Sequence, residues 1–138
     1  MLKPNFMYLH ICDDVRNEIG GKISMMGVYE KTLIVPSIPF VFPKLCFYSR
    51  FSGITENHIF NFSLTNPSGD IRKIIENSPC FPEEGEDQGI FNVVATPFEI
   101  IEEGKYVATI EIEEPENIHT YTKEFYVYDG NKLNKTEE

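Results

Sequence analysis

His10 and Cys12 lie two residues apart in an alternating segment, so their side chains project from one face of an extended strand. An imidazole and a thiolate at this spacing could share a zinc ion, but a structural zinc site needs about four ligands. His58 and His119 are far away in the sequence, and no CxxC, HxxxH or HExxH spacing accompanies them. We therefore predict no metal site and expect His10 to be a partly buried, hydrogen-bonded residue.

Cys12 or Cys46 could act as a nucleophile if one of the three histidines served as its base. The sequence lacks the GxSxG, GxxxxGK and GxGxxG patterns that mark hydrolase elbows and nucleotide sites. We predict no catalytic residues and no cofactor, with a cryptic hydrolase as the second alternative.

Two groups of carboxylates, Asp13 with Asp14 and a cluster further along the chain, could supply the oxygen ligands that calcium prefers. The cluster consists of Glu83, Glu84, Glu86 and Asp87. Glutamates predominate and no DxDxDG-like spacing surrounds a single point, which favours a solvated loop. A cation-binding or ligand-binding sandwich, similar to a C2 domain or a carbohydrate-binding module, is the first alternative function.

The net charge of -10 is concentrated in one part of the chain. Twelve acidic residues and one basic residue, Lys105, occur between Glu76 and Glu116. Phosphate backbones and anionic lipid surfaces should repel such a chain. We therefore expect neither a nucleic-acid partner nor a membrane partner.

No apolar run approaches the roughly 18 residues of a membrane span, and the N-terminal residues lack a signal-peptide core. The three cysteines, Cys12, Cys46 and Cys80, form an odd and widely spaced set. This set suits a reducing compartment better than a disulfide framework. We expect a cytoplasmic protein.

The elements that must position these residues are β-strands, because most segments alternate apolar and polar residues between Gly, Pro and Asn. We predict about eight or nine strands in an all-β, single-domain antiparallel β-sandwich, Ig-like or jelly-roll-like, with a partly closed barrel as the alternative. The domain spans residues 1–128, and residues 129–138 form a flexible polar tail. The strands are expected at residues 6–12, 22–29, 32–35, 44–51, 58–65, 71–75, 90–96, 105–113 and 120–128.

Several connections have expected conformations. Gly20-Gly21 predicts a two-residue hairpin that pairs Val15 with Met26, with a bulge or short helical turn over residues 13–16. The proline-rich residues 36–43 should form an extended connection that covers one end of the core. Residues 76–89 should be the most mobile surface loop. Gly104-Lys105-Tyr106 predicts a tyrosine corner, in which the hydroxyl binds the backbone.

One face of the first strand should carry Leu9 and Ile11, and the other should carry Phe6, His10 and Cys12. In the strand at residues 105–113, Tyr106, Ala108, Ile110 and Ile112 should face the core.

The run Asp13-Asp14-Val15-Arg16 followed by Gly21-Lys22-Ile23-Ser24-Met25-Met26-Gly27-Val28-Tyr29 resembles the N-terminal signature of a family of small, uncharacterised bacterial proteins. Pro43-Lys44-Leu45-Cys46, Asn66-Pro67-Ser68-Gly69 and Gly104-Lys105-Tyr106 extend the resemblance across residues 6–128. It implies a cytoplasmic β-sandwich domain of unknown function without known catalytic residues.

We therefore expect a non-catalytic interaction or accessory module that recognises an unknown protein partner through its surface. An edge strand could serve this role and could also pair two copies of the chain. The other candidate surface residues are Glu83, Glu84, Glu86, Asp87, Tyr121, Tyr126 and Tyr128.

Overall fold

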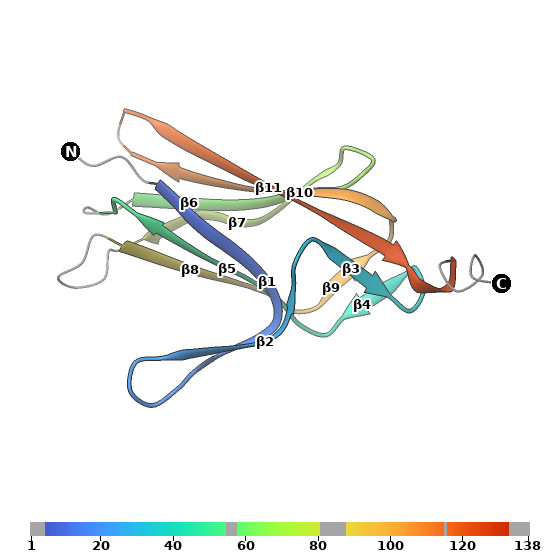
Figure 1. The fold of residues 1–138 in the computed structure, drawn as a ribbon. Helices are drawn as coiled ribbons and strands as arrows, with labels where there is room; N and C mark the ends of the chain where they lie inside the picture. The colour runs from blue at the N-terminus through green and yellow to red at the C-terminus, as the bar shows by residue number, and fades with distance from the viewer. Residues whose placement is uncertain (1–4, 55–57, 81–87, 115, 133–138) are drawn as a thin grey trace.

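The computed structural model describes residues 5–54, 58–80, 88–114 and 116–132, which contain eleven strands. The strands are β1 (Asn5–Asn17), β2 (Ile23–Tyr29), β3 (Thr32–Val35), β4 (Phe40–Phe42), β5 (Leu45–Ser52), β6 (His58–Thr65), β7 (Ile71–Cys80), β8 (Gln88–Ala95), β9 (Phe98–Ile100), β10 (Gly104–Glu113) and β11 (Ile118–Asp129). Four of them form a sheet in the order β2-β1-β5-β8 (Figure 1). Five form a second sheet in the order β3-β11-β10-β6-β7, and β4 pairs with β9.

The core lies between the two larger sheets. On β10 the alternation is as expected, because Tyr106, Ala108, Ile110 and Ile112 are all buried. Phe47 of β5 reaches across to the second sheet, with ring centroids 5.1 Å from Phe62 and 6.2 Å from Phe125. The predicted all-β fold is therefore confirmed.

Two features of the sheets differ from the expectation. β3 pairs with β11 in parallel, whereas we expected only antiparallel pairs. The strands outnumber the predicted eight or nine, because the connections before β5 and β10 contain the short strands β4 and β9. The proline-rich connection still covers the core, since Phe42 is buried there against Phe40 and Phe98.

The β1–β2 hairpin has a different register from the predicted one. Val15 pairs with Met25 rather than Met26, and β1 continues as a strand to Asn17 without the expected bulge or helical turn. The reason is a loop of three residues, since the Glu18 amide donates to the Lys22 carbonyl at 2.7 Å across Ile19, Gly20 and Gly21. Gly20 and Gly21 both have positive φ, at 93° and 76°, so neither simply continues a strand.

Phe6 faces the core, contrary to its predicted side. The register of β1 against β5 shifts between Phe6 and Tyr8, so Phe6 pairs with Phe51 and packs on it at 5.5 Å. A β-bulge changes which residues share a face, and periodicity alone does not predict its position.

The expected loop at residues 76–89 is shorter than predicted, because β7 extends to Cys80 and β8 begins at Gln88. Glu83, Glu84, Glu86 and Asp87 lie outside the described residues.

The expected tail does not begin at Asp129, which is the last residue of β11 and is buried. Its carboxylate accepts hydrogen bonds from the Ile38 and Asn131 amides, and its own amide donates to Glu103. Polar residues therefore hold the chain here through hydrogen bonds rather than apolar contacts. No helix in the described part of the chain has the length and hydropathy of a transmembrane span.

Candidate functional site

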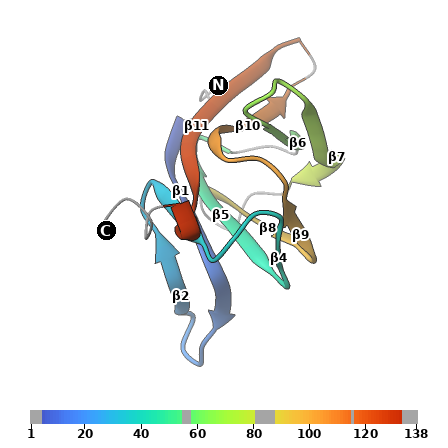
Figure 2. The same ribbon diagram turned by 90° about the vertical axis from the view of Figure 1, so that its right-hand side faces the viewer.

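The β1–β2 hairpin extends beyond the part of β1 that pairs with β5, and we call its residues 13–28 the β1–β2 arm (Figure 2). Large apolar side chains are exposed along it. Ile19 at the tip is 96% exposed, and Met26 and Val28 on β2 are 46% and 47% exposed. A groove of about 430 Å³ separates the arm from the outer face of β5 and β8, with Val15 and Ile23 on one side and Tyr48, Arg50 and Asn92 on the other.

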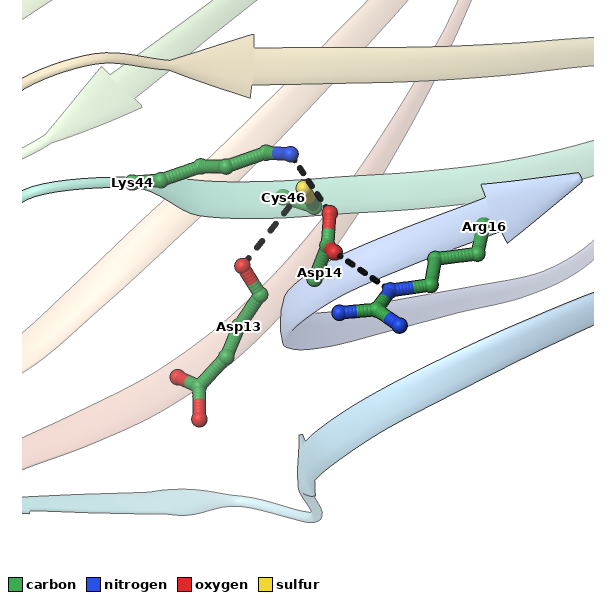
Figure 3. Close-up of polar contacts among 5 residues, drawn as sticks. All are labelled: Asp13, Asp14, Arg16, Lys44 and Cys46. Carbon is green, nitrogen blue, oxygen red and sulfur yellow. Dashed lines mark hydrogen bonds and ion pairs between the residues drawn. The ribbon is translucent and has the colours of Figure 1, made fainter.

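A charge cluster occupies the base of the arm (Figure 3). The Asp14 carboxylate pairs with Lys44 Nζ at 2.5 Å and with Arg16 Nε at 3.2 Å. Hydrogen bonds from Lys44 and then Arg16 hold the pKa of Asp14 below its ordinary value, and the Asp14 carboxylate raises the pKa of Lys44. The Lys44 and Arg16 side chains are 42% and 62% exposed, so this cluster contributes little to stability.

Asp13 has different partners from Asp14. Its carboxylate accepts a 2.8 Å hydrogen bond from the Tyr29 hydroxyl and lies over Gly27, whose φ is +65°. Burial, and then the bond to Asp13, raise the pKa of Tyr29 to about 12. Because the two neighbouring carboxylates are directed to separate protein partners, they do not converge on one point as calcium ligands would.

Cys12 and Cys46 are direct neighbours on β1 and β5, and neither is exposed to solvent. The Asp13 carbonyl lies 4.0 Å from Cys46 Sγ, so the start of the arm contacts this thiol (Figure 3). Burial raises the pKa of Cys12 to about 11 and also raises the pKa of Cys46. Both thiols are therefore protonated at neutral pH, unlike a catalytic cysteine. His10, on the same face, packs against the Tyr8 ring at 4.7 Å.

A cluster that the sequence reasoning missed lies at the other end of the sandwich. Glu114 Oε1 is 3.2 Å from His58 Nε2, and Glu114 Oε2 is 3.3 Å from His119 Nε2, although the second contact lacks hydrogen-bond alignment. The hydrogen bond from His58 holds the pKa of Glu114 below its ordinary value. The three residues come from β6, the β10–β11 turn and β11, so only the sheet order could have predicted their meeting.

Residues 7–122 match DUF6941, a family of unknown function. The chain belongs to this family. No curated protein matches the chain. The whole β1–β2 arm and its charge cluster fall inside the part of the chain that defines DUF6941 membership.

In this DUF6941 protein the three candidate tyrosines do not form one surface. Tyr121 is partly buried, with its ring 5.2 Å from Phe51 and 6.0 Å from Phe6. Tyr126 and Tyr128 stack at 6.3 Å on the opposite face of β11, where they alternate with the inward-facing Phe125 and Val127. Tyr121 stands at an odd position of β11 and the other two tyrosines at even positions, so their side chains project from opposite faces of the sheet.

Among the residues described for this DUF6941 protein, no three His, Cys, Asp or Glu side chains are placed to hold a metal ion together. His10 and Cys12 share a face as expected, while His58 and His119 both contact Glu114 instead.

Proposed function

We propose that this protein is a non-catalytic module that binds a protein partner through the β1–β2 arm. The observation that carries the proposal is the concentration of exposed apolar side chains there. Ile19, Ile23, Met26 and Val28 are all at least 37% exposed. Met26 and Val28 lie on the same face of β2, and neighbouring exposed apolar side chains of this kind are typical of an interaction surface.

The backbone of the arm supports recognition by strand addition. β2 forms one edge of its sheet and contains no charged residue from Ile23 to Tyr29. An edge strand presents unpaired N–H and C=O groups, and isolated domains usually protect such edges with charges or prolines. Gly27 interrupts the extended backbone with its positive φ, so Ile23–Met26 is the regular segment that a partner strand would pair with.

The cysteines and aspartates support a non-catalytic role. Burial keeps the Cys12 and Cys46 thiols protonated, and Asp13 and Asp14 are engaged by Tyr29, Lys44 and Arg16. As part of the same proposal the protein acts in the bacterial cytoplasm, a reducing compartment that suits its free cysteines.

The test uses the purified chain as bait in an extract of its native cells, with the double variant Met26→Glu and Val28→Glu compared with wild type. We expect the variant to lose a partner that wild type recovers, because two carboxylates would have to be buried in the interface. Binding to the purified partner should weaken by about 100-fold or more, since each buried charge costs several kcal/mol.

Two matched variants control for non-specific effects. Ile71→Glu changes an apolar residue that is 66% exposed on the edge strand of the other sheet, and Tyr126→Ser with Tyr128→Ser removes the stacked tyrosines. Both should retain the partner. Loss of the partner in the tyrosine variant with retention in the arm variant would move the interface to β11 and refute the proposal.

A further inference from the structure

Cys12 and Cys46 meet the geometric requirement for a disulfide. They are paired directly across two antiparallel strands, β1 and β5. Directly opposed residues have Cα atoms about 4.5–5.5 Å apart, within the range of about 4.4–6.8 Å that a disulfide spans. The two thiols are close enough for each to shift the pKa of the other. Cys80, the third free thiol, is buried on β7 in the other sheet and pairs with His58.

The cover over the two thiols is weakly held. The groups beside them include the Asp13 carbonyl, 4.0 Å from Cys46 Sγ, and the ion pair of Asp14 and Lys44, whose charges act on the pKa of Cys46. Exposed ion pairs contribute only about 0.2–1 kcal/mol, so their opening needs little free energy. An opening confined to the base of the arm would uncover both sulfur atoms together and leave the core between the sheets intact.

We propose that Cys12 and Cys46 are a reversible redox pair, which forms a cross-strand disulfide when the base of the arm opens to a small-molecule disulfide such as oxidised glutathione. This inference does not depend on the proposed function of the arm.

The reaction has two exchange steps. One uncovered cysteine loses its proton, and its thiolate attacks a sulfur of the small disulfide, which breaks that S–S bond and releases one small thiolate. The second cysteine thiolate then attacks the protein sulfur of the mixed disulfide and releases the second small thiolate. The two released thiolates take up the two protons, so the protein pair is oxidised by two electrons and the small disulfide is reduced to two thiols.

The test incubates purified Cys80→Ser protein with oxidised glutathione and follows intact mass without reductant. We expect a monomer that has lost two hydrogen atoms, a peptide map that joins Cys12 to Cys46, and full reversal by dithiothreitol. Cys12→Ser and Cys46→Ser in the same background should each give a mixed disulfide or no change. If the native protein stays reduced while the urea-unfolded chain oxidises to completion, the proposal is wrong.

A second measurement tests the role of the cover. Lys44→Ala and Asp14→Asn should each speed disulfide formation about two- to fivefold, the factor that corresponds to removing an exposed ion pair. Lys73→Ala, which removes the exposed pair with Glu76 on β7, should leave the rate unchanged. Equal rates in all four proteins would contradict opening at the base of the arm.

Discussion

Tyr106 shows how one hydroxyl can fix a connection between strands. Its ring is buried against Phe125, while its hydroxyl donates a 2.7 Å hydrogen bond to the Glu102 carbonyl four residues earlier. This is the tyrosine corner predicted from Gly104-Lys105-Tyr106. It was predictable because all of its parts lie within a few residues of each other.

Tyr106→Phe should lower the free energy of unfolding by about 1–2 kcal/mol, because the Glu102 carbonyl loses its partner while the packing is kept. Urea denaturation measures this change. The matched control is Tyr126→Phe, whose ring faces outward on β11 and which should change stability by less than about 0.5 kcal/mol. Equal losses in the two variants would mean that the corner hydrogen bond has no special contribution.

Two features favour glycine at position 27, namely its positive φ and the close approach of the Asp13 carboxylate. A Cβ atom at this position would lie within 2.2 Å of Asp13 Oδ2, so Asp13 would have to move and lose its bond to Tyr29. We expect Gly27→Ala to destabilise the protein by more than about 2 kcal/mol. In an Asp13→Ala background the same change should cost only about 1 kcal/mol, the backbone contribution. Thermal or urea unfolding of the four proteins completes this double-mutant cycle, and additive effects would contradict the clash.

At the scale of elements, alternation predicted the buried face of β10 and the existence of β3, β6 and β8. The wrong predictions occur where a one-residue shift in strand register, or a bulge, moves side chains to the opposite face of the strand. The three-residue loop at Ile19–Gly21 shifted the β1–β2 register by one, and the bulge near Phe6 moved that ring to the core. Loop length depends on backbone conformations that two adjacent glycines leave open.

The candidate site was predicted less well than the fold, because its contacts join distant strands. Asp13 and Asp14 drew attention as a pair, but their partners Tyr29 and Lys44 follow from the hairpin and from the β1–β5 pairing. The Cys12–Cys46 contact likewise needs the sheet order. Contacts of this kind depend on which strands are neighbours in the sheet, and the spacing of residues within one strand does not predict that.

The contacts of Glu114 with His58 and His119 link β6, β11 and the β10–β11 turn. We therefore expect the stability of the folded protein to depend on the ionisation of Glu114. The pKa of Glu114 is lowered in the folded protein, so its ionised form stabilises the fold above the unfolded pKa of about 4.3. That contribution is lost as the pH falls through the lowered folded value. Glu114→Gln should therefore lose less stability than wild type between about pH 5 and pH 3.

Urea denaturation at several pH values measures this difference. Glu116→Gln, an exposed change on the same turn, should keep the wild-type slope. If Glu114→Gln and wild type show parallel slopes, the carboxylate contributes nothing that depends on its ionisation.

At the scale of the whole molecule, the two large sheets depend on a shared aromatic core centred on Phe47. Its ring lies within about 6 Å of Phe62, Phe98 and Phe125, which come from three different strands. We expect Phe47→Ala to lower the free energy of unfolding by about 3–5 kcal/mol, because a cavity would open between the sheets. Val94→Ala on the outer face of β8, where the side chain is 42% exposed, should change it by less than about 0.5 kcal/mol in the same urea titration.

The parallel pairing of β3 with β11 affects how the chain is made. Thr32 finds its sheet neighbour at Tyr126, and Val35 finds its neighbour at Asp129. A ribosome releases β3 long before β11, so during synthesis this early strand has no neighbour in its own sheet. Pairing over such a separation is also slow to form in a complete chain. Assembly of the second sheet must therefore finish after translation of Asp129, and a nascent chain stalled before β11 would expose the apolar side chains of β3.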